Sequence, residues 1–135
     1  MIFFLRGLFI FILVSMLAVT GWAGIHCPLF AIPANVVSHP WFIATLFDAY
    51  WAFVTFYVWV AFKQTSWASK IAWFIAVILL GNVAMSAYCL NELFRIPRTG
   101  RMADVLTTKR DGIGLLGPIL AVLGLTVTLL GLPRS

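Results

Sequence analysis

The stretch WFIATLFDAYWAFVTFYVWVAF, from Trp41 to Phe62, is the strongest indication of fold class in this chain. It is an almost unbroken series of apolar and aromatic residues, and Asp48 is its one charged residue. A membrane-spanning helix needs about 20 consecutive apolar residues, so the stretch predicts a transmembrane helix over residues 41–62. A carboxylate inside such a helix is costly unless it faces protein and has a partner. We therefore expect Asp48 to point into a helix bundle.

The composition of the whole chain favours the same fold class. Of its 135 residues, 63% are hydrophobic and 10% are charged, and the mean hydropathy is +1.06. A soluble domain of this length carries more polar surface. The formal net charge is +5, but the basic residues stand at the ends of apolar runs, where lipid headgroups lie. The charge therefore predicts contact with a lipid bilayer and argues against nucleic-acid binding.

Three further apolar runs predict three more helices, over about residues 2–24, 71–94 and 112–132. The first run carries Arg6 and shares features with a secretory signal, but we expect an uncleaved helix. The last run contains Pro118, which predicts a kink. Together the runs predict an all-α integral membrane protein, with a four-transmembrane-helix bundle formed by a single membrane domain over residues 1–135.

The segments between the runs predict how the helices are connected. Prolines make a continuous helix between residues 25 and 40 unfavourable. The short polar turn KQTSWASK, from Lys63 to Lys70, predicts that the second and third helices are antiparallel neighbours. In the third loop, Met102, Val105 and Leu106 have helical spacing and predict a short interfacial segment that lies on the headgroups.

Four crossings would place the first and third loops on one side of the membrane and both termini on the other. The positive-inside rule does not determine the orientation, because five basic residues lie in the third loop and four lie on the other side of the membrane. Those four lie in shorter segments, so we expect the termini to be cytoplasmic, in a plasma or inner membrane.

Polar residues of the predicted helices lie at similar depths. At the helical rise, Asp48 is about 10 Å below the surface of the first and third loops, and Asn82 and Ser86 are about 13 and 8 Å below it. Ser15 lies at a comparable depth, and Thr45 shares a helix face with Asp48. We expect Asp48 to accept hydrogen bonds from Asn82 and Ser86.

Three interpretations of this polar cluster remain open. Its hydrogen bonds could serve only to join helices, at about 1 kcal/mol each. The cluster could instead bind an ion, a proton or a small polar ligand, or its residues could face lipid or a partner.

Small residues form a stripe along the last predicted helix. They follow one another at spacings of three or four residues, which places them on one helix face; they are Gly114, Gly117, Ala121, Gly124, Thr128 and Gly131. Such a face allows two helices to approach closely in lipid, so the stripe predicts helix packing. The alternative is the ordinary enrichment of glycine in membrane helices.

The two cysteines, Cys27 and Cys89, fall near the same predicted surface. A disulfide between them is topologically allowed in an oxidising compartment, and two unpaired structural cysteines are the alternative. His26, His39 and Glu92 fall near that surface as well, but the set has no recognised metal-ligand spacing. We therefore predict no metal site.

The middle of the chain, from Ala44 to Phe94, resembles a family of small multi-span membrane proteins catalogued as a domain of unknown function, DUF1475. The resemblance rests on TLFDAYWAFVTFYVWVAFKQTSW, with its early acid and lysine-containing turn, and on LLGNVAMSAYCLNELF, with its Gly-Asn step. It implies a membrane fold. The family has no established activity, so the resemblance implies no mechanism.

The sequence contains no HExxH, nucleophile-elbow or paired-acid motif, and we do not expect an enzyme. It also identifies no cofactor. We expect a non-catalytic accessory or assembly subunit that belongs to a homo-oligomer or a larger membrane complex. The alternative is a small transporter, channel or ligand-binding bundle that uses the cluster of Asp48, Asn82 and Ser86.

Overall fold

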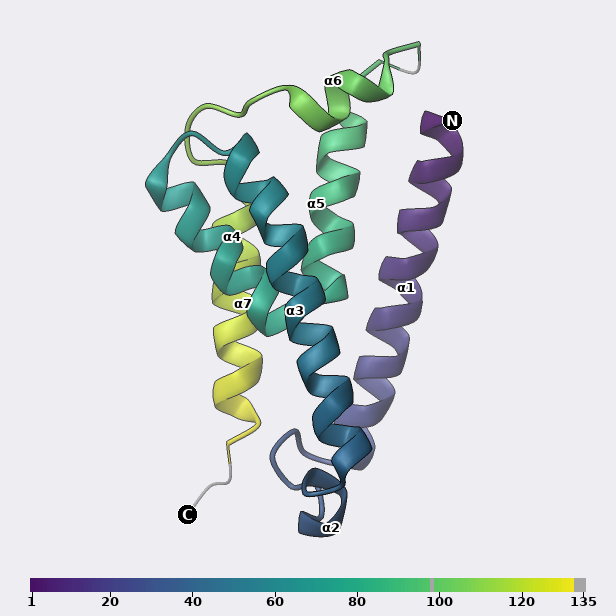
Figure 1. Ribbon diagram of the computed structural model, residues 1–135, viewed down its shortest axis with the longest axis vertical. Coiled ribbons are helices and arrows are strands. Elements are labelled where there is room, and N and C mark those ends of the chain that lie inside the picture. Colours follow the sequence, from purple (N-terminus) through teal and green to yellow (C-terminus); the bar gives the residue numbers. More distant parts are fainter. Residues whose placement is uncertain (98, 133–135) are drawn as a thin grey trace.

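The computed structural model describes residues 1–97 and 99–132, and within these ranges it contains helices and no strands. The helices are α1 (Ile2–His26), α2 (Ala34–Val37), α3 (Pro40–Lys63), α4 (Trp67–Leu80), α5 (Asn82–Phe94), α6 (Met102–Thr107) and α7 (Leu116–Leu130) (Figure 1). The prediction of an all-helical protein is therefore confirmed. The number and the directions of the helices differ from the four that the hydropathy pattern predicted.

The single helix predicted over residues 71–94 is wrong, because the chain reverses at Gly81 between α4 and α5. Gly81 has φ 50° and ψ −125°, a conformation that suits glycine because it has no Cβ atom. The two helices have 14 and 13 residues, so each is about 20 Å long. α4 starts at one end of the molecule and stops midway, and α5 returns to that end (Figure 1). We call α4 and α5 the helical hairpin.

The tip of the helical hairpin lies against the middle of α3. A Cβ atom added to Gly81 would be 2.6 Å from Cζ of Phe53 in α3. The distance along the helix from Phe53 to Lys63, the last residue of α3, is about 15 Å, whereas all of α3 is about 36 Å long. The hairpin therefore penetrates somewhat less than half the length of α3.

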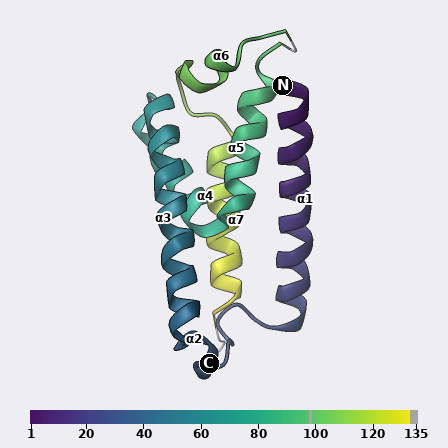
Figure 2. The ribbon, with the colours of Figure 1, turned by 45° about the vertical axis from the view of Figure 1, so that its right-hand side comes forward.

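The other long helices run between the two ends of the molecule (Figures 1 and 2). α1 leads away from the end that holds α6, α3 returns to it, and α7 leads away again. The last turn of α7 reaches the loop after α1, since a Cβ added to Gly131 would be 2.9 Å from Cβ of Leu29. The start of α1 and the end of α7 thus lie at opposite ends, whereas the sequence predicted both termini on one side. The error arises because the hairpin returns to the end from which it started.

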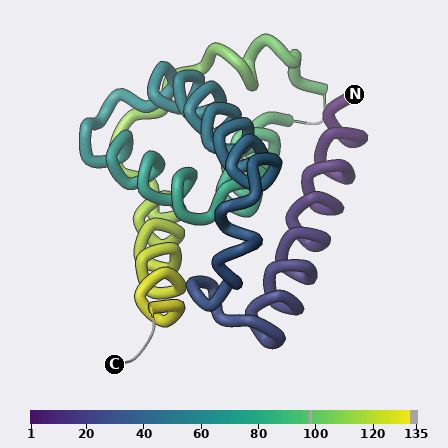
Figure 3. The backbone as a smooth tube through the Cα atoms, turned by 60° about the horizontal axis from the view of Figure 1, so that its bottom comes forward, coloured from purple at the N-terminus to yellow at the C-terminus, as the bar shows by residue number. Residues whose placement is uncertain are grey.

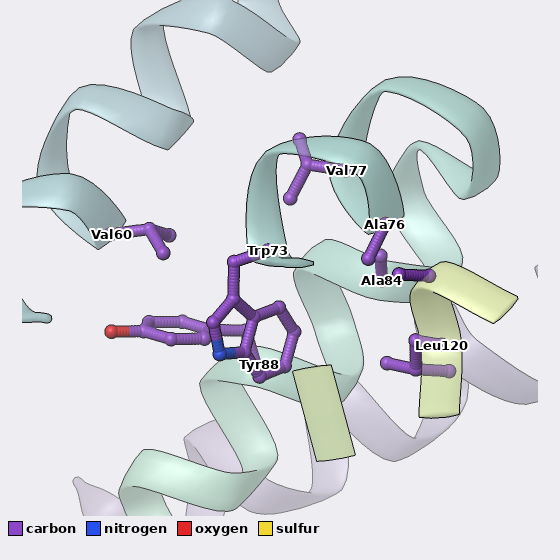
Figure 4. Close-up of a cluster of buried hydrophobic side chains, with 8 residues drawn as sticks. Val60, Trp73, Ala76, Val77, Ala84, Tyr88 and Leu120 are labelled. Atoms are coloured by element: carbon purple, nitrogen blue, oxygen red, sulfur yellow. The ribbon is translucent and has the colours of Figure 1, made fainter. Parts of the chain in front are cut away.

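Two buried clusters hold the helices together. The larger one lies among α3, the hairpin and α7 (Figure 4), and contains Val60, Trp73, Ala76, Val77, Ala84, Tyr88, Leu120 and Ala121. The smaller one joins the start of α1 to the region around α6, through Ile2, Leu93, Ile96 and Val105. The last ten residues of α1, the connector that follows and the start of α3 have little cover: every residue from Leu17 to Trp41 is exposed.

α7 begins later than predicted, at Leu116, so Gly114 precedes the helix. Pro118 consequently lies in the first turn of α7, where its missing N–H removes no helical hydrogen bond. The kink predicted at Pro118 is therefore wrong, and the residue instead helps to start the helix.

Small residues of α7 face α4. Gly117, Ala121 and Gly124 are buried. An added Cβ would be 2.9 Å from Nε1 of Trp73 at Gly117, and 2.9 Å from Cβ of Leu79 at Gly124. The absence of larger side chains on this face allows α4 and α7 to pack closely.

Two helices, α1 and α3, are long and apolar enough to cross a membrane on length and composition alone. α7 is apolar but has only 15 residues. Figure 3 brings the end opposite α6 towards the viewer. In this view α1 and α7 lie on opposite sides of the molecule, and α3 lies between them. The short helix predicted in the third loop is present as α6, and its Val105 is buried.

Candidate functional site

Buried charged side chains meet at the end of the molecule where α3 and α5 finish and α6 lies. Lys63 and Glu92 form an ion pair in which both side chains are fully buried. Lys63 Nζ also donates to the carbonyl oxygen of Val105. Arg110 Nε donates to both carboxylate oxygens of Glu92, at 3.1 and 2.9 Å. The Glu92 carboxylate thus connects α5 to α3 and to the segment that leads to α7, and Lys63 connects α3 to α6.

We call Lys63, Glu92 and Arg110 the ion cluster. It contains two cations and one carboxylate, so its formal net charge is +1. Buried charges are costly unless they are paired and hydrogen-bonded. Nη2 of Arg110 is buried and has no hydrogen-bond partner in the part of the chain that the structure describes. The ion cluster therefore lacks one negative charge for neutrality.

Backbone hydrogen bonds hold the two cations of the ion cluster in place. The N–H of Arg110 donates to the carbonyl oxygen of Lys63 at 2.7 Å, and the N–H of Thr65 donates to the carbonyl oxygen of Arg110 at 3.1 Å. The hydroxyl of Thr65 donates to Asp111 Oδ1 at 2.9 Å. The segment before α7 is therefore fastened to the turn between α3 and α4, which preorganises the side chains around Glu92.

A second buried polar group lies beside the ion cluster. Gln64 Nε2 donates to the hydroxyl of Tyr88 at 3.2 Å, and the hydroxyl of Ser69 donates to Gln64 Oε1 at 2.8 Å. The Tyr88 ring packs edge-on against Trp73, with ring centroids 4.7 Å apart (Figure 4). These contacts join the two arms of the helical hairpin to each other and to the end of α3.

A polar cavity of about 160 Å³ lies between the ion cluster and the first turn of α7. Its wall includes Gln64, Trp73, Asn91, Glu92, Arg95, Arg110 and Asp111, together with residues 112–114, 116 and 117. Trp73 is 4% exposed, and no protein acceptor for its indole N–H is present among residues 1–97 and 99–132. We call this space the polar cavity.

Arg6 fastens α1 to the same end of the molecule. Its Nη2 donates to the carbonyl oxygens of Leu93 and Ile96, at 2.7 and 2.9 Å. Its guanidinium group lies over the ring of Phe94, 4.9 Å from the centroid. The last carbonyl groups of a helix have no partner within the helix, so Arg6 also caps the end of α5.

The basic residues of the described chain all lie at this end, which we call the basic end (Figure 1); they are Arg6, Lys63, Lys70, Arg95, Arg101, Lys109 and Arg110. Arg98 and Arg134 lie outside the described residues. The sequence interpretation had divided the basic residues between two surfaces, because it treated the hairpin as a full crossing.

The polar cluster predicted around Asp48 does not form within the described chain. Asp48 is exposed, and no hydrogen bond joins it to Asn82 or Ser86. Asn82 is exposed beside the turn at Gly81, and Ser86 is buried in α5. A straight helix over residues 71–94 would have carried Ser86 to the level of Asp48. Because the chain reverses at Gly81, Ser86 lies towards the basic end instead.

The other two residues of the predicted polar cluster bond within their own helices. Ser15 Oγ donates to the carbonyl oxygen of Ile12 at 2.9 Å, and Thr45 Oγ1 donates to that of Trp41 at 2.8 Å. The α3 stripe that was expected to face the bundle interior is exposed along its length; it comprises Ala44, Thr45, Asp48, Ala52 and Thr55.

Of the two alternatives for Cys27 and Cys89, the structure has the unpaired one, since both cysteines are free. Cys27 caps the end of α1 and is exposed, whereas Cys89 is buried in α5. The reversal at Gly81 explains their separation, because it carries Cys89 to the basic end. For the same reason Glu92 lies far from His26 and His39, and the described residues contain no group of three or more His, Cys, Asp and Glu side chains that could hold a metal.

The ion cluster was not predicted from the sequence, although its members carry a signal. Glu92 ends an apolar run and therefore needs a cationic partner, as Asp48 does. Lys63 ends the preceding run, but a third full crossing would have put the two residues on opposite surfaces. The Gly-Asn step at residues 81 and 82 is the one local sign that the run reverses.

Comparison with known proteins adds one match. The family model described as a protein of unknown function (DUF1475) matches residues 3–112. Neither the comparison with curated proteins nor that with solved structures found a match.

Proposed function

The chain belongs to the DUF1475 family, and from that premise we propose that it is an integral membrane protein that serves as a non-catalytic accessory or assembly subunit. In this proposal α1, α3 and the apolar run of residues 112–132 that contains α7 pass through the bilayer, and the helical hairpin enters it from the basic end without crossing. A half-length helical pair is tolerated at membrane depth where protein surrounds it, and α3 and α7 pack against this pair.

Lengths and exposure support the membrane location. α1 and α3 have 25 and 24 residues, so each is longer than the hydrocarbon core of about 30 Å. Large apolar side chains along both helices are exposed, including Phe11, Trp51 and Val58. A lipid environment covers such surfaces at no cost, whereas water does not.

The charge distribution supports one orientation. Cytoplasmic segments of membrane proteins are enriched in Lys and Arg, and the described basic residues all lie at the basic end. We therefore place the basic end and the N-terminus in the cytoplasm. The end of α7 then lies on the opposite side, in contrast to the earlier expectation of two cytoplasmic termini.

Asp48 is the observation that carries the accessory role. It lies about 12 Å from the start of α3, inside the proposed bilayer. It is exposed, and the described chain gives it no hydrogen-bond donor. A carboxylate in lipid is expensive, and such residues face protein partners. The chain does not supply the partner, so we assign that role to a helix of another subunit.

The surroundings of Asp48 suit a docked helix. The stripe that contains Asp48 presents Ala44 and Ala52, small residues that allow close helix approach. Beside it lies an apolar groove of about 420 Å³, lined by Leu46, Phe47, Tyr50, Trp51 and Val54. A partner helix would place apolar side chains in the groove and a hydrogen-bond donor next to Asp48.

The alternative, a transporter, channel or ligand-binding bundle built on Asp48, Asn82 and Ser86, has less support. Its three residues do not share a site, because Asp48 is exposed and Ser86 is buried in another helix.

Photo-crosslinking in the natural membrane tests the accessory role. A photoreactive amino acid replaces Trp51, and crosslinked proteins are identified by mass spectrometry with and without Asp48→Leu or Asp48→Asn. We expect one stoichiometric partner of a different sequence, lost in Asp48→Leu; retention in Asp48→Asn would indicate a neutral donor. Crosslinks to a second copy alone, or no specific crosslink, would contradict the accessory role. A photoreactive residue at Val122, exposed on α7, is the control position.

A further inference from the structure

We propose that the polar cavity at the basic end binds a phosphate group, either in a phospholipid headgroup or as free phosphate. The ligand would lie against Trp73, Arg95 and the first turn of α7, beside Arg110. This inference concerns a site that is separate from the Asp48 surface. The lipid form of it also requires the membrane location proposed above.

Trp73 supplies the first indication that an acceptor belongs in the polar cavity. Its side chain is buried between α4 and α7, with an exposed fraction of 4%. Its indole Nε1 lines the cavity side, close to Gly117. This N–H is not among the fully buried unpartnered polar atoms, so it opens to the cavity, and the described protein atoms give it no acceptor. A ligand or water in the cavity would accept from it.

Arg110 supplies positive charge beside the cavity. Its Nε is occupied by Glu92, and its Nη2, which has no partner among the described residues, is fully buried, so Arg110 attracts an anion by its charge and not by a direct contact. Arg95 adds a further guanidinium group to the wall, and an added Cβ on Gly114 would be 3.9 Å from Arg95 Nη2. Guanidinium groups carry only donors and match the oxygens of phosphate in geometry.

The first turn of α7 supplies backbone donors. Leu116 and Gly117 line the polar cavity, and no side chain caps this end of the helix. The first N–H groups of a helix have no partner within the helix and carry partial positive charge, which makes a helix N-terminus favourable for anions. Gly117 has no side chain to stand between its backbone and the cavity. The third helical residue, Pro118, has no N–H and contributes nothing here.

The acceptors in the wall do not satisfy these donors. Both oxygens of Glu92 are engaged by Arg110 and Lys63, and the carbonyl oxygen of the Gln64 side chain is engaged by Ser69. Asp111 opposes anion binding, but its Oδ1 accepts from Thr65. The formal charges of Lys63, Arg95, Arg110, Glu92 and Asp111 sum to +1, so the site remains short of negative charge.

The size of the polar cavity limits the ligand. At about 160 Å³ it is smaller than the usual pockets for drug-sized ligands, which are about 300–1,000 Å³. It can hold one phosphate group, but a larger ligand would have to extend outside. The cavity lies at the basic end, where headgroups of anionic lipids gather, so a lipid phosphate could enter while its acyl chains remain in the bilayer.

Tryptophan indole resonances provide a direct test in the intact chain. The protein is labelled with ¹⁵N at the indole nitrogens, and Trp73→Phe assigns the Trp73 signal. One arm titrates inorganic phosphate into protein in a neutral detergent. The other compares nanodiscs of phosphatidylcholine with nanodiscs that also contain phosphatidic acid. We expect a saturable downfield shift of the Trp73 proton in at least one arm, and the arm that responds identifies the source of the phosphate.

Matched arginine variants separate a site from a general charge effect. Arg95→Gln and Arg101→Gln each remove one exposed charge at the basic end, but only Arg95 lines the polar cavity. We expect Arg95→Gln to weaken half-saturation at least tenfold and Arg101→Gln to change it less than twofold. No saturable shift in either arm, or equal weakening by the two variants, would overturn the proposal. Neither variant removes a member of the ion cluster, so we expect both to fold.

Discussion

At the scale of single residues, Glu92 holds more of the basic end together than any acid predicted from the sequence. It is fully buried, and it accepts hydrogen bonds from Lys63 and Arg110. The pair is not in itself a strong source of stability, because burying two charges costs about as much as their attraction returns. Loss of one member of the ion cluster is strongly destabilising, because it leaves the other charges buried and unpaired.

We predict that Glu92→Gln lowers the free energy of unfolding by about 3–5 kcal/mol, the usual cost of removing one partner from a buried ion pair. Glutamine has nearly the same shape as glutamate, so the loss would come from charge and not from packing. Chemical unfolding in detergent micelles, followed by far-UV circular dichroism, measures the change.

Asp111→Asn is the matched control for Glu92→Gln. Asp111 is an exposed acid at the same end, and it contacts Thr65 rather than a cation. We expect little change in unfolding from Asp111→Asn. Equal effects of the two variants would mean that burial of the Glu92 charge does not dominate the stability of the basic end.

At the scale of elements, the reversal at Gly81 separates what the sequence could predict from what it could not. Hydropathy reports that residues 71–94 are apolar, but it carries no information on direction. A glycine inside an apolar run is common in membrane helices, so Gly81 gave little warning. The long helices α1 and α3 could be predicted because length and composition are enough to identify them. The short helix α6 could be predicted from the helical spacing of its apolar residues.

The conformation of Gly81 gives the second prediction. In Gly81→Ala the new Cβ would have to adopt φ 50° and would meet the Phe53 ring at 2.6 Å. We expect a loss of about 1–3 kcal/mol in unfolding free energy, the usual cost of a strained backbone residue. Unfolding in the same detergent measures it. The turn would also lose definition, which limited proteolysis of the hairpin would detect.

Gly21→Ala controls for the general effect of alanine in place of glycine. Gly21 lies within α1, and an added Cβ there would meet nothing within 4 Å. Alanine is the better helix former by about 1 kcal/mol, so Gly21→Ala should leave stability unchanged or raise it. If Gly81→Ala were equally harmless, the turn at Gly81 would not be a fixed feature of the native state.

At the scale of the whole molecule, the single turn at Gly81 accounts for the wrong placement of the third loop and of the residues near it. Counting the hairpin as a crossing moved the third loop to the wrong end. That placed Cys89 near Cys27 and Ser86 level with Asp48, and it separated Glu92 from Lys63. The ion cluster and the polar cavity depend on segments that are far apart in the sequence, so no local pattern could have indicated them once residues 71–94 were taken as one straight helix.

The reversal at Gly81 also changes where the basic residues lie: they gather at one end of the molecule and are not divided between two. With four crossings the basic residues fall on two surfaces, and the positive-inside rule decides little. With the hairpin, the loops on both sides of it share one end with the start of α1. In the proposed membrane orientation, this single basic surface would guide insertion, and the end that holds His26 and His39 would face the other compartment.

Labelling of single cysteines tests this arrangement without reference to which side is cytoplasmic. Three positions suffice: native Cys27 in a Cys89→Ser background, and Thr65→Cys and Arg101→Cys with both native cysteines replaced by serine. All three positions are exposed. A membrane-impermeant maleimide is applied to intact cells and to permeabilised cells.

We expect positions 65 and 101 to label from one side and Cys27 from the other, because the hairpin returns to its starting surface. A four-crossing bundle instead requires Cys27 and position 101 to label together, with position 65 opposite. The pairing of position 101 therefore decides between the two topologies, since it must share a side with either position 65 or Cys27.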